Sequence, residues 1–472
     1  MPRRLTVEQN FVRMTETPVP RLIATLSVPT IISMLVTTFY HMADTVFVSR
    51  LGTQASGAVG IVFALMSIIQ ALGMTLGLGA GNYVARLLGA KENDKANQVL
   101  STAFFTALGM GGFLCVVGLS FLSPFMRLLG STETILPYAK AYGGIILLGA
   151  PLMAASFVMN TTLRSEGNAG LGMRGIVVGS VLNVVLDPLL IFVFGLGIKG
   201  AAIATVFSQS VSFLILLSFF LRGRSTLVLS ITCFRPRKWL YKEVLWTGMP
   251  AFNRQGMASV SMIVLNNVAS PYGDSALAAM AIVTRTMQFL GSALIGFGQG
   301  FQPVSGFSWG AGRYDRLRQA FRFSLFTGIV AFFILGSLGF AFAPAVMRLF
   351  IKTDPKVVAI GALAMRLQCL AMPLQATSII ISMLFQSIGK PKQASLSALA
   401  RQGIFFLPLV LILPRFFGVL GIQMSQPLAD VATFCLSMVF STLFWKRLKE
   451  HGINSGDARY RRDPSSDPRS ND

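Results

Sequence analysis

The amino-acid sequence predicts an all-α polytopic membrane protein with twelve transmembrane helices in two six-helix bundles. The first observation is composition: 53% of the 472 residues are hydrophobic and only 12% are charged, roughly half the charged share of a soluble protein. The second is that apolar runs of about 20 residues, long enough to cross a bilayer as helices, recur from end to end. The third is an internal repeat at an offset of 221 residues.

The repeat divides the chain into two halves of six spans. Val-Pro at 28–29 matches Met-Pro at 249–250, and Gly52 matches Gly273. Because six is an even number, both halves enter the membrane from the same side, and the repeat is parallel. Parallel repeats are typical of secondary transporters, in which two bundles move around a central site.

The expected spans have the following bounds: 22–49, 57–79, 97–122, 136–163, 173–196, 200–221, 243–269, 277–307, 320–343, 357–386, 394–414 and 420–445. They define an N-lobe at 22–222 and a C-lobe at 243–445, joined by a basic linker at 223–242. The remaining parts are a cytoplasmic segment at 1–21 and a polar tail at 446–472, which we expect to be disordered and cytoplasmic.

The net charge of +22 does not indicate a nucleic-acid partner, because the basic residues are unevenly distributed. Most of them cluster at the N-terminus, in the even-numbered loops and in the tail, which predicts that both termini are cytoplasmic. The first residues are polar and mixed in charge, and we expect no cleavable signal peptide. The four cysteines have no metal-ligand spacing, and we expect inert thiols.

The first span contains an acid at membrane depth, Asp44, preceded one turn earlier by Tyr40. An ionised carboxylate at this depth is costly unless it has a partner. Pro29 interrupts the same span and frees the carbonyl of Thr25. The resulting kink is either a hinge that responds to the acid or a static bend.

The fifth span contains the second isolated acid, Asp187, with Asn183 four residues before it on the same helical face. Thr205, early in the sixth span, should reach a similar depth. Two carboxylates, an amide and a hydroxyl are oxygen ligands suited to Na⁺, and the same acids could instead carry protons. The alternative is a buried structural hydrogen-bond pair. The second half has no acids at the matching positions, so we expect any cation task to belong to the N-lobe.

Further polar residues lie inside apolar spans. Asn160, in the fourth span, either lines the substrate pathway or makes a helix–helix hydrogen bond. Arg254, Arg285 and Asp430 fall near mid-depth in the second half and should avoid lipid. We expect an internal ion-pair network among these three residues, with contact to an acidic substrate as the second interpretation.

The chain resembles the multidrug and toxic compound extrusion (MATE) family, especially its bacterial DinF- and MepA-like branches. The resemblance covers roughly residues 20–445 and is carried by several motifs together. They are the first span with Pro29 and Asp44, the LGA turn after span two, LRSEGNAG after span four, NVVLDP in span five and GIKGAAIATVFSQ in span six.

The resemblance implies a V-shaped pair of six-helix lobes in a prokaryotic inner membrane. It implies efflux of amphiphilic, cationic drugs or metabolites in exchange for Na⁺ or H⁺ by alternating access, without enzymatic activity or a cofactor, and we expect a monomer whose partners are small molecules and the lipid bilayer. Carried over by motif, Asp44, Asn183, Asp187 and Thr205 would bind the coupling ion, with Tyr40 and Asn160 along the pathway.

Two other functions are alternatives to drug efflux. The first is a flippase for lipid-linked precursors from the same superfamily, whose members usually have extra spans or a strongly charged cavity. The second is an intramembrane aspartyl protease, which also needs two membrane aspartates. Asp187 lacks the GxGD motif of such proteases, and proteolysis gives no reason for a 221-residue repeat.

Overall fold

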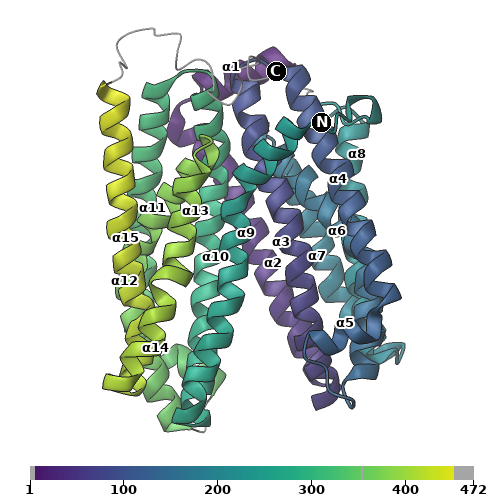
Figure 1. Ribbon diagram of the computed structural model, residues 1–472, viewed down its shortest axis with the longest axis vertical. Helices are drawn as coiled ribbons and strands as arrows, with labels where there is room; N and C mark the ends of the chain where they lie inside the picture. Colours follow the sequence, from purple (N-terminus) through teal and green to yellow (C-terminus); the bar gives the residue numbers. More distant parts are fainter. Residues whose placement is uncertain (1–5, 352–353, 451–472) are drawn as a thin grey trace.

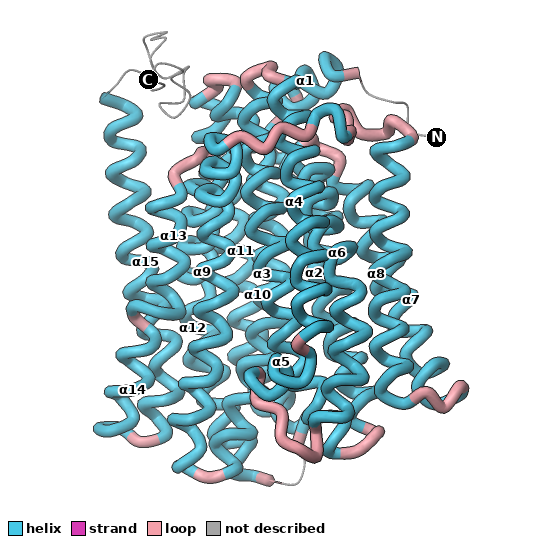
Figure 2. The backbone as a smooth tube through the Cα atoms, turned by 45° about the vertical axis from the view of Figure 1, so that its right-hand side comes forward, coloured by secondary structure: helices cyan, strands magenta, loops and turns pink. Residues whose placement is uncertain are grey.

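The computed structural model describes residues 6–351 and 354–450 as two helical lobes that meet at one end and diverge toward the other, like a V (Figure 1). The first and last described residues at the two ends of the chain, Thr6 and Glu450, lie at the end where the lobes meet. Within the described ranges, the regular structure is entirely helical (Figure 2). The predicted fold class is therefore confirmed.

The N-lobe follows a short helix, α1 (Val7–Glu16). Its elements are α2 (Val19–Ser49), α3 (Thr53–Gly89), α4 (Asn93–Ser120), α5 (Leu122–Leu128), α6 (Leu136–Ser165), α7 (Ala169–Pro188), a π-helical turn η1 (Leu189–Val193) and α8 (Gly197–Leu221). A short 3₁₀ turn, η2 (Ile231–Cys233), lies in the linker to the second lobe.

The C-lobe repeats this order. Its elements are α9 (Lys238–Ala269), the 3₁₀ turn η3 (Ser270–Tyr272), α10 (Asp274–Gly310), α11 (Tyr314–Phe350), α12 (Pro355–Ser387), α13 (Pro391–Leu399), a π-helical turn η4 (Ala400–Ile404), α14 (Phe406–Phe417) and α15 (Val419–Glu450).

The backbone of the two lobes keeps the offset seen in the sequence. Helices α3 and α10 both have 37 residues, and their first residues are 221 positions apart. Each helix follows a glycine in the left-handed region, Gly52 with φ 111° and Gly273 with φ 92°. A side chain is strained at such an angle, so glycine allows the same tight entry in both lobes.

Among the described helices, eleven are long and apolar enough to cross a membrane by length and composition. The remaining expected span is the seventh, which corresponds to α9. This helix has 32 residues and would extend about 48 Å, more than the hydrocarbon thickness of about 30 Å. It is less apolar than the others because it contains charged residues such as Glu243 and Arg254. These charges lie on a helix that packs against other helices, chiefly α3 and α13.

Several element boundaries differ from those expected. The segment 1–21 contains helix α1, whose Thr6 forms a capping box with Gln9, and α2 begins within it at Val19. Helix α9 begins at Lys238, inside the expected linker. Residues 446–450 continue α15 instead of opening a disordered tail, and the rest of that tail lies outside the described residues. The expected bounds followed the apolar runs only. The helices are longer than these runs because a helix can continue through charged residues beyond the membrane boundary.

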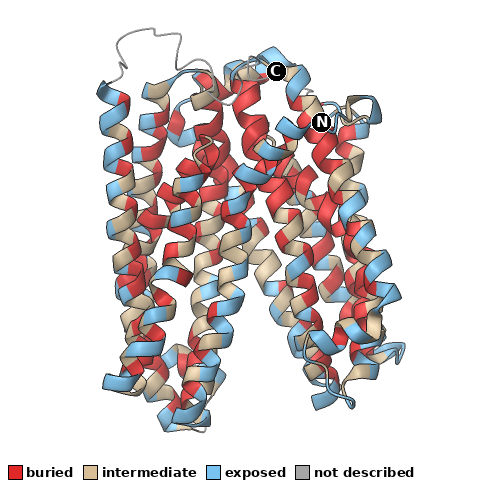
Figure 3. Cartoon of the chain, in the orientation of Figure 1, coloured by how far each residue is buried: buried red, intermediate tan, exposed pale blue. Residues whose placement is uncertain are grey.

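The lobes touch through glycines that allow backbone contact. A Cβ atom built on Gly79 of α3 would lie 2.0 Å from the carbonyl oxygen of Val244 in α9, and one built on Gly300 of α10 would lie 2.4 Å from Ser27 Cα in α2. Buried residues gather toward this end of the molecule, whereas the diverging ends are more exposed (Figure 3). Close backbone packing without side chains therefore forms the contact between the lobes.

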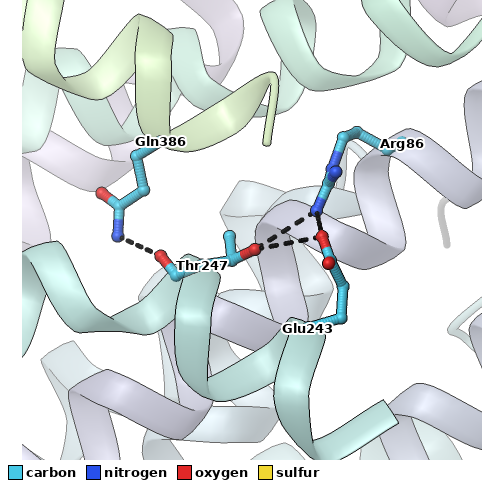
Figure 4. Close-up of polar contacts among 4 residues, drawn as sticks. All are labelled: Arg86, Glu243, Thr247 and Gln386. Carbon is cyan, nitrogen blue, oxygen red and sulfur yellow. Dashed lines mark hydrogen bonds and ion pairs between the residues drawn. The ribbon is translucent and has the colours of Figure 1, made fainter. Parts of the chain in front are cut away.

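An ion pair reinforces the contact between the lobes (Figure 4). Arg86 of α3 donates from Nη2 to Glu243 Oε1 of α9 at 2.6 Å and to Thr247 Oγ1 at 3.3 Å. Gln386 of α12 donates to the carbonyl oxygen of Thr247 at 3.1 Å. The Arg86 and Glu243 side chains are 7% and 16% exposed, so the pair is mostly shielded from water and holds the lobes together where solvent screening is weak.

The LRSEGNAG motif ties the linker to the N-lobe. Glu166 is buried, and its Oε2 accepts hydrogen bonds from Ser225 Oγ at 2.8 Å, Thr226 N at 2.9 Å and Thr226 Oγ1 at 2.8 Å. Burial raises the pKa of this carboxyl, and the hydrogen bonds lower it in part. The motif thus attaches the loop after α6 to the chain that leads into the C-lobe.

Candidate cation-binding site

The structure brings the two isolated acids of the N-lobe together. Asp44 on α2 and Asp187 on α7 are buried, and their carboxyl groups lie close enough to hydrogen-bond with each other. Two carboxylates at such a distance repel unless a proton or another cation lies between them. The pair therefore attracts a proton or another cation, as a cation-binding site must.

Asn183 connects Asp187 to the neighbouring helix. Its Nδ2 lies 3.4 Å from Asp187 Oδ1 and 3.4 Å from Thr205 Oγ1 on α8. Both distances exceed the usual N–H···O range of about 2.7–3.2 Å, so both hydrogen bonds are weak. The four residues that the sequence singled out, Asp44, Asn183, Asp187 and Thr205, thus come from three helices to one place.

Close packing of α7 against α8 explains why such short side chains meet. A Cβ atom built on Gly179 would lie 2.9 Å from Ser212 Cβ and 3.0 Å from the carbonyl oxygen of Ser208. Because glycine allows the helix axes to approach, Asn183 can reach Thr205 across the interface. One turn after Asn183, the helix ends at Asp187-Pro188 and continues as the π-helical turn η1. Such turns are frequent at functional sites.

Four polar atoms at this site are buried and have no hydrogen-bond partner among the described residues: Asp44 Oδ1, Tyr142 Oη, Asn183 Oδ1 and Asp187 Oδ2. Buried oxygen atoms without partners are costly in a protein interior. Na⁺ prefers hard oxygen ligands, and a proton would satisfy one carboxyl oxygen. The donor set therefore fits either ion, although no cluster of three His, Cys, Asp or Glu residues occurs in the described ranges.

Two aromatic hydroxyls lie beside the acids. Tyr40 is buried within hydrogen-bonding reach of Gln209, and Tyr142 lies next to Thr205. Sequence analysis identified Tyr40 but missed Gln209 and Tyr142. Gln209 lies one turn after Thr205 on the same helix, a spacing that could have revealed it. Tyr142, on α6, had no local signal.

Asn160 does not belong to this group. It is buried on α6, and a Cβ atom built on Gly172 of α7 would lie 2.8 Å from Asn160 Nδ2. Gly172 precedes Asp187 by 15 residues, about 22 Å along a helix. Asn160 therefore lies away from the cation site and against α7, and its place along the substrate pathway stays a prediction.

The ion-pair network expected among Arg254, Arg285 and Asp430 is wrong, because the partner of Asp430 is a different arginine. Asp430 of α15 pairs with Arg401 of η4, with Nε to Oδ1 at 2.7 Å. Arg254 makes no ion pair with a described residue, and Arg285 is exposed on α10. Sequence analysis missed Arg401, which lies within the eleventh expected span, 394–414. The two residues meet only because η4 packs against α15.

Comparison with known proteins gives one consistent result. The sequence profile of the MatE family matches residues 29–189 and 250–412, once in each lobe. The multidrug export protein MepA of Staphylococcus saprophyticus is 26% identical over 423 residues, which cover 89% of this chain and 93% of that protein.

Solved structures agree with the sequence comparison. A MATE protein crystallised in complex with MaL6 superposes with a TM-score of 0.89 at 25% identity, covering 93% of this chain and 99% of the other. A multidrug resistance MATE transporter of the MOP superfamily, in an outward-facing conformation, superposes with a TM-score of 0.88 at 25% identity, covering 93% and 98%.

Proposed function

The chain belongs to the MATE family, in its MepA-like branch of multidrug efflux transporters, and from this premise we propose that it exports amphiphilic organic cations in exchange for Na⁺ or H⁺. The observation that carries the proposal is the contact between Asp44 and Asp187, with buried oxygen atoms around it that have no partner. Such a group of oxygen atoms binds a cation, and its two carboxylates repel each other when the cation leaves.

The coupling step begins with charge. When the ion occupies the site, it neutralises the repulsion between the two carboxylates and holds α2 against α7. When the ion leaves, the repulsion favours separation of these two helices. Binding of the ion can shift the conformational equilibrium only by its difference in affinity between the two arrangements.

Helix α2 links the site to the contact between the lobes. It contains Asp44 in its outer part, and near Pro29 it packs against α10, where Ser27 Oγ donates to the carbonyl oxygen of Phe297 at 3.1 Å. Pro29 removes one backbone hydrogen bond and makes bending of α2 easier there. A change at Asp44 can therefore reach the surface along which the lobes separate.

Alternating access then requires the contact between the lobes to break and the divergent ends to close. The Arg86–Glu243 ion pair and the glycine contacts stabilise the arrangement in which the opposite end is open. We assign the contacting end to the cytoplasm because the basic loops lie there. The membrane is a bacterial inner membrane, and we propose that the protein works as a monomer.

The test is transport in proteoliposomes that contain the full-length protein and a fluorescent cationic dye. An imposed Na⁺ gradient and an imposed pH gradient, applied separately, should identify the coupling ion, since only one should drive efflux. Asp187→Asn should abolish gradient-driven efflux, whereas the exposed Asp274→Asn on α10 should not change it. Efflux at the wild-type rate from Asp187→Asn would refute the proposed coupling site.

A further inference from the structure

We propose that the C-lobe contains an anion subsite, formed by Arg254 and Arg401, that binds the carboxylate of a zwitterionic amphiphile, whose other charged group is cationic. The proposal deepens the export function above and rests on it for the role of the ligand as a transported molecule. Four observations carry it: the charge balance of the cluster, its unpaired guanidinium, its place in the repeat and its partial exposure.

The first observation is that, within the part of the chain that the structure describes, the cluster forms its ion pair with one carboxylate, that of Asp430. Arg401 Nε donates to Asp430 Oδ1 at 2.7 Å, and Gln426 Nε2 donates to the same oxygen at 3.2 Å. The Asp430 side chain is 4% exposed, so this carboxylate is committed to Arg401 inside the lobe. Its negative charge offsets one guanidinium.

The second observation is a surplus positive charge beside this pair. Arg254 on α9 lies close enough to Arg401 for their charges to repel, and its buried Nη2 has no hydrogen-bond partner among the described residues. An unpaired cation inside a membrane-spanning lobe is costly. The group that relieves this cost best is a planar oxyanion, which a guanidinium can bind through two parallel hydrogen bonds. One surplus charge suits a group with one negative charge.

The third observation is the place of the cluster in the repeat. The N-lobe site is built from α2, α7 and α8, and the C-lobe cluster is built from their counterparts α9, η4 and α15. Gln426 occupies the position of Thr205, and Asp430 that of Gln209, each 221 residues later. Both lobes therefore hold a polar site between the same three helices, acidic in one lobe and basic in the other.

The fourth observation is access, together with an apolar wall. The Arg401 side chain is 23% exposed, so the cluster is not sealed. Its surroundings include Met257 of α9, whose methyl group would be 2.9 Å from a Cβ atom built on Gly403. Methionine is a flexible apolar residue that adapts to ligands of different shape. A charged site beside such a wall suits an amphiphile better than a small inorganic anion.

A matched pair of dyes tests the subsite. The purified full-length protein is titrated with a rhodamine that has a free carboxylate and with the methyl ester of the same dye, and binding is followed by fluorescence polarisation. Arg254→Gln should weaken binding of the free acid at least about tenfold, because it removes a charged donor that can make two parallel hydrogen bonds, and should leave binding of the ester unchanged. Arg254→Lys, which keeps the charge, should lose less.

Arg285 is exposed, and Arg285→Gln is the matched control, which should change the binding of neither dye. Melting curves show whether each variant is folded. An equal loss for both dyes, or no loss for either, would overturn the subsite. Another result would also overturn it: binding to phosphatidylglycerol vesicles that depends on Arg254, together with binding of the free-acid dye that does not. A lipid headgroup would then be the occupant of the site. Export of the ester by the wild-type protein tests the proposed function separately, so either proposal can fail alone.

Discussion

At the scale of single residues, we propose that the Asp44 and Asp187 carboxyl groups bind one shared ion, and on this proposal their substitutions should not be additive. Removing either acid should stop coupled efflux or raise the cation concentration that half-saturates it. The double variant Asp44→Asn/Asp187→Asn should be little worse than either single variant, because residues that act as a unit lose their common function at the first substitution. Initial efflux rates against cation concentration measure this effect. Losses that multiply would mean two independent sites.

A second substitution at the residue scale tests whether the Arg401–Asp430 ion pair of the C-lobe takes part in ion coupling. Asp430→Asn leaves two neighbouring guanidinium groups without a carboxylate, and breaking a buried ion pair typically costs about 3–5 kcal/mol. We expect a lower melting temperature in detergent, with the cation dependence of efflux unchanged in the protein that remains folded. A shifted cation dependence with normal melting would instead give the C-lobe a part in coupling.

At the scale of elements, the contact between α2 and α10 depends on Gly300. An alanine there would put a methyl group 2.4 Å from Ser27 Cα, a backbone atom that cannot yield without moving the helix. Gly300→Ala should therefore separate the lobes at their contacting end. A cysteine at the buried Ser308, in a background without the four native cysteines, should then react faster with an impermeant thiol reagent in inside-out vesicles.

The control for this substitution is Gly109→Ala on α4, where the added methyl group meets nothing within 4 Å. That change should leave labelling at position 308 unaltered and, because alanine favours a helix over glycine, stabilise α4 by up to about 1 kcal/mol. Equal labelling of both variants would show that Gly300 does not control the closure.

At the scale of the whole molecule, the distribution of basic residues predicts the orientation in the membrane. A cysteine at Arg224, in the linker between the lobes, should resist an impermeant reagent applied to intact cells. A cysteine at Thr134, exposed before α6, should react readily. Labelling in the opposite sense would place the contacting end of the V outside the cell and reverse the direction of transport that we propose.

Much of this architecture could be predicted because it depends on local properties of the chain. The cost of transferring each segment into lipid determines which runs become membrane-spanning helices, and the repeat required two lobes of the same order. The acids Asp44 and Asp187 were recognisable for the same reason, since an isolated carboxylate in an apolar run needs a partner. Asn183 followed from its spacing of four residues before Asp187.

Only the tertiary structure decided which side chains meet across helices. No local feature of the sequence distinguishes Arg401 from the other basic residues. Its contact with Asp430 depends on the packing of η4 on α15. Tyr142 joins the cation site from another helix, and Arg86 reaches Glu243 across 157 positions of the chain. Such contacts depend on how each helix is rotated and how closely its neighbours approach, and those quantities are determined by packing between distant segments rather than by the composition of any one of them.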